Sequence, residues 1–128
     1  MSIKKSTPVL LVPEIEPCVK FWERLGFSKT VEVPEGDKLA FVILVNGAIE
    51  LMYQTYSSVQ ADNATIGAEA GKGPAFLYVE VDNLADTRQA IADVPLLMQE
   101  RTTFYGAKEF AVKDPGGHIV TFAQMGAQ

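Results

Sequence analysis

Stretches with the two-residue apolar period of strands alternate along this chain with stretches that have the longer period of helices. An apolar stripe in residues 18–25 predicts a helix, with Pro17 suited to its first turn and Gly26 to its end. A second helix is predicted over residues 84–92, where Asp82-Asn83 supplies capping side chains. Each predicted helix therefore begins at residues that favour a helix start.

Strands are predicted where apolar and β-branched residues gather between turn-forming residues. Near the end of the chain, Phe110 and Val112 share one face of a strand and Glu109 lies on the other. The turn Asp114-Pro115-Gly116-Gly117 separates that strand from the last one. The predicted strands are residues 7–12, 27–33, 39–45, 48–53, 75–81, 109–113 and 119–123, and residues 95–102 form either a weaker strand or a loop.

The dipeptide Asn46-Gly47 predicts a tight hairpin, because both residue types accept the positive φ that a two-residue turn requires. With these residues as the whole turn, the two flanking strands have one register, and partners in it share a face of the sheet. The predicted pairs are Val45 with Ala48, Ile43 with Glu50, and Phe41 with Met52.

The order of the predicted elements repeats, since a strand, a helix and three strands occur twice. The strand-to-helix junctions Val12-Pro13-Glu14-Ile15 and Val81-Asp82-Asn83-Leu84 align, although the halves share little sequence identity. A βαβββ unit covers one face of its sheet with its helix and leaves the other face to a partner. We therefore predict an α+β fold, one domain over residues 1–128, in which half-modules 6–54 and 75–125 curve mixed sheets around a cleft, with the helices outside.

Residues 55–74 connect the two half-modules. They are polar, rich in small residues and without an apolar period. A structureless connection of this length is unusual inside a compact domain. We expect a mobile connector that acts as a lid over a site or as a linker.

Composition narrows the classes of function. With 128 residues, 48% hydrophobic and 21% charged, the chain is long enough for one soluble domain with a core. No apolar run approaches the ~20 residues of a membrane span, no secretion signal is visible, and the single cysteine, Cys18, excludes an intrachain disulfide. The net charge of −5 argues against nucleic acid and anionic membranes as partners. We expect a cytoplasmic protein, and the acidic balance favours a cationic ligand.

Several short segments carry a resemblance to a known superfamily. They are Pro8-Val9-Leu10, Val19-Lys20-Phe21-Trp22, Leu25-Gly26-Phe27, Tyr105-Gly106, Glu109-Phe110-Ala111-Val112 and Asp114-Pro115-Gly116-Gly117. With the paired βαβββ modules, they resemble the glyoxalase, bleomycin-resistance and extradiol-dioxygenase superfamily, which has the vicinal oxygen chelate fold. The Phe-Trp helix and the Glu-Phe-Ala segment most resemble bleomycin-resistance proteins. Members of this superfamily range from metalloenzymes to pure binding proteins, so the fold alone does not decide the chemistry.

The resemblance implies where a metal would be held. Metal-dependent members place His, Gln or Glu ligands on the first and last strands of each module. By alignment of the modules these positions are Thr7, Glu50, Phe76 and Thr121, of which only Glu50 is a competent ligand. One carboxylate cannot hold a divalent ion, and His118 is predicted on the opposite face from Thr121, at a turn or on the surface. We therefore expect neither a metal nor another cofactor.

The predicted ligand site follows from the alternation of faces along each strand, with Glu50 facing the cleft. The resemblance places Tyr105 near the ligand groove, and Trp22 is assigned to packing between helix and sheet. Aromatic, methionine and polar side chains together suit a flat, apolar small molecule, with a cationic group as one option. The apolar members could instead fill the space between the sheets. The predicted ligand-binding residues are Phe41, Ile43, Glu50, Met52, Phe76, Tyr78, Tyr105, Glu109 and Thr121.

Glu50 is predicted on an apolar face, where an unpaired buried carboxylate would cost several kcal/mol of folding free energy, about as much as a desolvated charge does. Either a basic side chain such as Lys38 or Lys108 reaches it, or the cleft is wet and Glu50 awaits a cationic group of the ligand. The acidic balance and the resemblance favour the second account.

Three functions are consistent with the sequence. The first, favoured by the resemblance, is a metal-free protein that sequesters a bleomycin-type antibiotic. The second is an uncharacterised enzyme of the superfamily that uses Glu50 or Glu109 as acid or base. The third is a binding module with no role towards drugs. No nucleophile elbow, phosphate loop or dinucleotide fingerprint is present. In each case we expect a small-molecule ligand and a homodimer.

Overall fold

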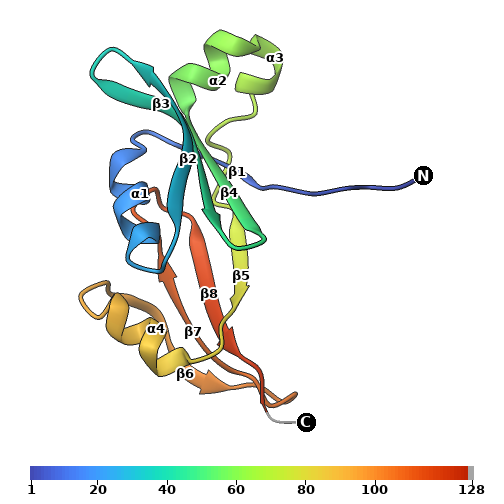
Figure 1. Ribbon diagram of the computed structural model, residues 1–128, viewed down its shortest axis with the longest axis vertical. Helices are drawn as coiled ribbons and strands as arrows, with labels where there is room; N and C mark the ends of the chain where they lie inside the picture. Colours follow the sequence, from blue (N-terminus) through green and yellow to red (C-terminus); the bar gives the residue numbers. More distant parts are fainter. Residues whose placement is uncertain (127–128) are drawn as a thin grey trace. The chain divides into compact units, whose positions relative to one another are not determined.

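The computed structural model describes residues 1–126, which form two compact units, residues 1–73 and residues 74 onwards. Each unit contains one four-stranded mixed sheet and at least one helix (Figure 1), so the chain is an α+β protein as predicted. Within the described residues no helix is both long and apolar enough to cross a membrane.

Unit 1 contains sheet A, with the strand order β1-β4-β3-β2. β1 runs parallel to β4, and the remaining pairs are antiparallel. Its elements are β1 (Val9–Val12), α1 (Glu16–Glu23), β2 (Ser28–Glu35), β3 (Lys38–Asn46), β4 (Ile49–Thr55), α2 (Tyr56–Asp62) and α3 (Ala64–Gly67).

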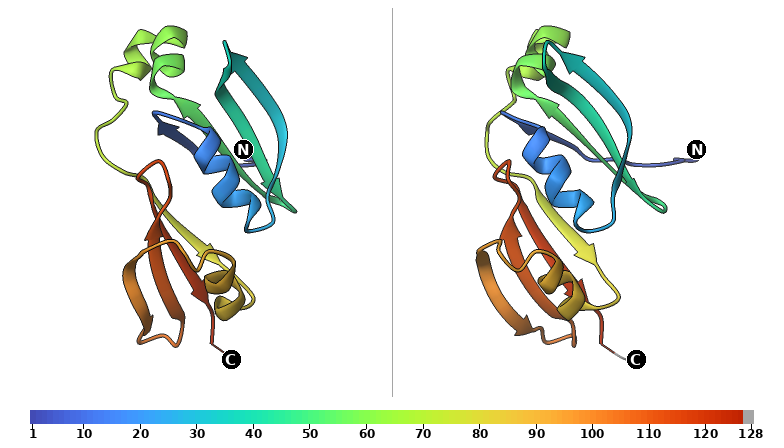
Figure 2. Two further views of the ribbon diagram at one scale, coloured as in Figure 1. Left: turned by 90° about the vertical axis from the view of Figure 1, so that its left-hand side faces the viewer. Right: turned by 60° about the vertical axis from the view of Figure 1, so that its left-hand side comes forward.

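Helix α1 covers one face of sheet A (Figure 2), and the core of unit 1 lies between them. Trp22 of α1 is 1% exposed and its indole nitrogen donates a 2.8 Å hydrogen bond to the Tyr53 hydroxyl on β4. Its ring also stacks edge-on with Phe21 and Phe27, at centroid distances of 5.2 and 5.0 Å. Trp22 therefore joins helix to sheet, as the sequence predicted. The buried sheet residues on this face are Leu10, Val12, Ala40, Val42, Leu44, Leu51 and Tyr53.

Unit 2 contains sheet B, with the matching order β5-β8-β7-β6. Its elements are β5 (Phe76–Glu80), α4 (Leu84–Ala90), β6 (Leu96–Thr102), β7 (Lys108–Lys113) and β8 (Ile119–Gln124). Residues 95–102, for which the sequence allows a strand or a loop, therefore contain a strand. Helix α4 covers the face that carries Phe110 and Phe122, whose rings lie 5.4 Å apart, and the Arg88 guanidinium sits 5.8 Å from the Phe110 centroid. The repeated order of strand, helix and three strands is confirmed.

The register predicted for the β3–β4 hairpin is wrong. Asn46 pairs with Ile49, so the turn consists of Gly47 and Ala48 rather than Asn46 and Gly47. Gly47 has φ +60°, whereas no described residue other than glycine has a positive φ. A turn with glycine at its first central position needs only one such residue. The shift moves the pairing by two residues, so the side chains keep their predicted faces. The observed pairs are Val45 with Glu50, Ile43 with Met52, and Phe41 with Gln54.

The connector is more ordered than predicted, because residues 55–74 contain α2 and α3. Thr55 caps α2 by accepting a hydrogen bond from the Ser58 amide at 3.2 Å, and Asn63 caps α3 by accepting one from Ile66 at 3.0 Å. These capping signals were present in the sequence, but segments this short lack the repeated apolar positions that reveal a helix.

His118 lies at a turn, as predicted, but it is buried rather than on the surface, at 7% exposure. Its Nδ1 accepts a 2.8 Å hydrogen bond from the Ala75 amide, and its own amide donates one of 2.8 Å to Asp114 Oδ1. Asp114 is also buried, at 3% exposure. The histidine therefore connects the start of β5 to the turn between β7 and β8.

Candidate functional site

Each sheet has a second face that its α1 or α4 helix does not cover, which we call the helix-free face. Eight of the nine predicted site residues lie on these faces, and Tyr105 lies in the loop between β6 and β7. They fall into two groups, one in each unit. Sheet A carries Phe41, Ile43, Glu50 and Met52, and sheet B carries Phe76, Tyr78, Glu109 and Thr121.

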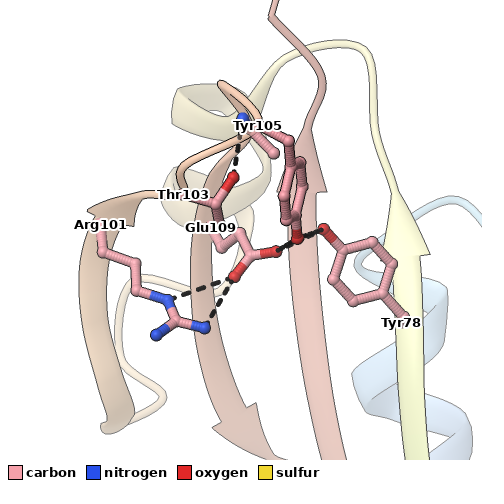
Figure 3. Close-up of polar contacts among 6 residues, drawn as sticks. Tyr78, Arg101, Thr103, Tyr105 and Glu109 are labelled. Carbon is pink, nitrogen blue, oxygen red and sulfur yellow. Dashed lines mark hydrogen bonds and ion pairs between the residues drawn. The ribbon is translucent and has the colours of Figure 1, made fainter.

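The sheet B group is organised around the carboxylate of Glu109, which is only 2% exposed (Figure 3). One oxygen, Oε2, accepts hydrogen bonds from the Tyr78 hydroxyl and, at 3.0 Å, from the Tyr105 hydroxyl. The other oxygen, Oε1, accepts from Arg101 Nε at 3.3 Å and Nη2 at 3.2 Å. The two phenol oxygens lie 3.3 Å apart. We call these four residues the Glu109 cluster.

These contacts determine the protonation states in the cluster. The Tyr78 hydroxyl, together with Tyr105 and Arg101, donates to the carboxylate and lowers the pKa of Glu109, although burial opposes the shift. The same hydrogen bond to Glu109, followed by the one to Tyr105, raises the pKa of Tyr78. At neutral pH the Glu109 carboxylate is therefore ionised and the Tyr78 hydroxyl is protonated.

A pocket of about 340 Å³ lies next to the Glu109 cluster, at the loop between β6 and β7. Arg101 and Tyr105 belong both to the cluster and to the pocket lining. Phe104 is fully exposed, and its ring meets that of Tyr105 edge-on at 5.0 Å. The Thr103 hydroxyl accepts a 3.0 Å hydrogen bond from the Ala107 amide, which closes the loop. The pocket is lined by Arg101, Thr102, Thr103, Phe104 and Tyr105.

The carboxylate of Glu50 in the sheet A group also has partners, but not those considered from sequence. Thr7 Oγ1 donates a 2.9 Å hydrogen bond to Oε1, and Lys5 Nζ lies 3.1 Å from the same oxygen. The hydrogen bond from Thr7 and then the one from Lys5 lower the pKa of Glu50. Lys38 is paired instead with Glu14, at 3.2 Å. A basic side chain therefore reaches Glu50, as in the first account, although it is Lys5 rather than Lys38 or Lys108. The favoured account, in which Glu50 awaits a cationic group of the ligand, is not supported by these contacts.

Two predicted positions in sheet B do not face each other. Phe76 lies opposite Ile119, whereas Thr121 lies opposite Tyr78. The alignment of the two half-modules matched Thr7 with Phe76, because it assumed equal spacing before the strand-to-helix junction. Buried Ile15 follows Thr7 by eight residues, whereas its counterpart Leu84 follows Tyr78 by only six. Counting back from the junctions therefore selected the wrong residue of β5.

The residues at these positions do not fit a metal ion. Thr7 and Glu50 are hydrogen-bonded to each other, Lys5 supplies a cation to the only carboxylate there, and Tyr78 and Thr121 offer hydroxyls. A divalent ion needs three or more well-placed donors. Over residues 1–126, no group of three or more His, Cys, Asp or Glu side chains is placed to hold one.

Sequence reasoning missed Arg101, Phe104 and Lys5. For Arg101 a signal existed, because a hairpin that joins residues 102 and 108 places Arg101 directly opposite Glu109, and opposite charges favour such cross-strand pairs. Phe104 lies in the loop between β6 and β7, where no alternation of faces indicates which side chains line a pocket. Lys5 precedes the first strand, so no periodic pattern could place it against Glu50.

Comparison with known proteins gives the family. Residues 6–122 match the family model of the Glyoxalase/Bleomycin resistance protein/Dioxygenase superfamily. The chain belongs to this superfamily. No curated protein sequence matches the chain.

Solved structures with the same fold include proteins whose names indicate binding and proteins whose names indicate catalysis. TioX from Micromonospora sp. ML1 is 16% identical with a TM-score of 0.77, over 94% of this chain and 98% of TioX. A bleomycin-binding protein complexed with bleomycin is 17% identical with a TM-score of 0.65, over 95% and 98%. Lactoylglutathione lyase from Agrobacterium tumefaciens is 16% identical with a TM-score of 0.74, over 97% and 95%. At these identities the likeness shows the superfamily fold alone.

Proposed function

We propose that this superfamily member is a metal-free small-molecule binding protein that takes up a flat aromatic ligand, in the manner of the bleomycin-binding protein, without converting it. The observation that carries the proposal is the aromatic wall of the pocket beside the Glu109 cluster. Phe104, which is fully exposed, and Tyr105, which is 52% exposed, line the pocket, and Tyr78 of the Glu109 cluster is also 52% exposed. Large exposed rings cost solvation free energy, and a planar ligand that covers them would recover it.

Binding fits the two carboxylates better than catalysis does. Hydrogen bonds hold the pKa of both Glu50 and Glu109 below the ordinary carboxyl value. A general base or acid works best with a pKa near the operating pH, whereas these shifts move both groups away from neutrality. The enzyme hypothesis therefore has less support than the binding hypothesis.

A thermal-shift screen tests the proposal. The compounds are bleomycin, planar aromatic antibiotics and S-lactoylglutathione, tested at several concentrations. A ligand at one hundred times its dissociation constant should add about 2.7 kcal/mol to the free energy of unfolding. Stabilisation by bleomycin or another antibiotic supports sequestration. A separate activity assay with S-lactoylglutathione completes the test, and turnover there would overturn the proposal in favour of an enzyme. Stabilisation by aromatic compounds that are not drugs would favour the plain binding module.

We also propose that the protein is a cytoplasmic homodimer, because small members of the superfamily commonly build their clefts between subunits. Sedimentation equilibrium at micromolar concentration tests the dimer, and a monomer there would contradict it. The prediction of a single domain with one cleft shared by both half-modules stays a prediction.

A further inference from the structure

The orientation of Arg101 leaves some N–H groups of its guanidinium without a hydrogen-bond acceptor among the described residues. Nε and Nη2 both donate to Oε1 of Glu109, on the inner side of the cluster. A guanidinium has five N–H donors in a planar fork. Nη1 donates no hydrogen bond within the part of the chain that the structure describes, and the side chain remains 61% exposed. Arg101 therefore has donors left for a ligand group.

Glu109 orients Arg101, and its own carboxylate is not accessible to a cationic ligand. Its carboxylate is 2% exposed, and both oxygens already accept hydrogen bonds from Tyr78, Tyr105 and Arg101. A buried carboxylate that pairs with one edge of a guanidinium reduces the rotamer freedom of the arginine and so lowers the entropy cost of binding at the other edge. Glu109 is thus a positioning residue for Arg101.

Arg101 is the one charged residue among the described residues that line the pocket. The other lining residues are two threonines and two aromatic residues, so no acidic side chain is among them. Glu80 lies on the same face of the sheet, separated from Glu109 by Ala123 of β8, and Glu100, which precedes Arg101 in β6, is not among the lining residues. The net charge of −5 opposes anions at long range, but salt at physiological concentration screens it beyond about 8 Å.

We propose, on the basis of the proposed binding function, that the ligand of this pocket is an aromatic acid whose carboxylate binds Arg101 and whose ring lies against Phe104 and Tyr105. Arginine recognises carboxylates through parallel N–H···O bonds, and these charged hydrogen bonds are stronger than neutral ones. The exposed Phe104 ring supplies a planar surface next to the fork. The preference for a cationic ligand rested on the net charge of −5 and on Glu50, and Lys5 and Thr7 already hold the Glu50 carboxylate.

The experiment uses three probes that share one ring system and differ in charge: 2-naphthoate, 2-naphthamide and 2-naphthylmethylammonium. Calorimetric or fluorescence titration at pH 7.5 measures the dissociation constant of each probe for the full-length protein. We expect 2-naphthoate to bind at least tenfold more tightly than the amide or the ammonium, which corresponds to about 1.4 kcal/mol.

Variants separate the two parts of the site. Arg101→Gln should weaken 2-naphthoate at least tenfold and leave 2-naphthamide within twofold. Arg101→Lys keeps the charge but loses the fork, so we expect an intermediate loss, and it serves as the second variant where Arg101→Gln does not fold. Phe104→Ala should weaken all three probes by a similar factor, and its full exposure makes a folding defect unexpected. The control Lys108→Gln removes a cation from the same hairpin, outside the pocket lining, and should change each constant less than twofold.

The outcomes distinguish this proposal from the proposed function. If 2-naphthoate and the ammonium bind equally well, or if Arg101 variants weaken all probes alike, an aromatic binding site remains and its preference for anions is refuted. If none of the three probes binds, the aromatic-acid proposal is refuted and the proposed function loses its support as well. A Lys108→Gln effect as large as that of Arg101→Gln would show a general charge effect and would also refute the arginine site.

Discussion

Thr7 Oγ1 donates a 2.9 Å hydrogen bond to Oε1 of Glu50, so two positions where metal-dependent relatives would hold their ion are bonded to each other. Lys5 completes the arrangement with an ammonium 3.1 Å from the same oxygen. Its side chain is 62% exposed, and ion pairs with such exposed partners contribute little to stability. The carboxylate is thus satisfied locally, by residues that precede the first strand.

Replacement of Glu50 by Gln should therefore change the melting temperature by less than about 2 °C. The amide oxygen of Gln can still accept the Thr7 hydrogen bond, and only the exposed pair with Lys5 is lost. Differential scanning calorimetry in low and high salt measures the effect, with Glu14→Gln as a control, because Glu14 forms a comparable exposed pair with Lys38. A loss of many degrees would mean that the carboxylate supports the fold in a way that these contacts do not explain.

Replacement of Glu109 by Gln should lower the free energy of unfolding at pH 7 by about 1–3 kcal/mol, because the buried carboxylate loses charged hydrogen bonds. The folded-state pKa of Glu109 is lowered from 4.5, so its contribution is complete above that pH and is lost as the pH falls through the folded-state pKa. The difference between wild type and variant should therefore shrink below about pH 4.5.

Urea denaturation between pH 7 and pH 3 measures this difference. Glu100→Gln is the matched control, since Glu100 lies on the neighbouring strand β6 and forms no ion pair within residues 1–126. A difference that stays constant down to pH 3, or that grows as the pH falls, would contradict the assigned role of the Glu109 carboxylate.

Replacement of Gly47 by Ala should cost about 1–2 kcal/mol. Gly47 has φ +60°, which an L-residue adopts with difficulty, and a Cβ there would meet no atom within 4 Å, so the cost comes from the backbone alone. Ala48→Gly, the neighbouring control, should cost less, because Ala48 needs no positive φ. Equal effects of the two substitutions in urea denaturation would contradict the positive φ assigned to Gly47.

Replacement of Tyr53 by Phe should destabilise unit 1 by about 1–3 kcal/mol, since the buried Trp22 indole loses its 2.8 Å acceptor. The double variant Trp22→Phe with Tyr53→Phe completes a mutant cycle that isolates the interaction from the loss of packing. Additive effects of the two substitutions would show that the hydrogen bond contributes nothing to stability.

The repeat of strand, helix and three strands was readable from sequence because it depends on local signals. Apolar periods, capping residues such as Asn83 and stop signals such as Gly26 act within a few residues of where they stand. The assignment of side chains to the faces of each sheet followed from the same periods. It remained correct although the predicted β3–β4 turn was wrong, since a shift of two residues preserves the face.

The candidate site depended on tertiary structure, because its contacts join residues that no local pattern relates. Lys5 reaches Glu50 from outside any strand, and Tyr78 reaches Glu109 from two strands away. The charge that remains available at the pocket depends on which donors Arg101 has already committed, and that is a property of side-chain geometry. The sequence by itself determined the α+β architecture and the residues on each face, whereas only the tertiary structure decided which carboxylates are already paired, because pairing energies depend on distances of a few ångströms.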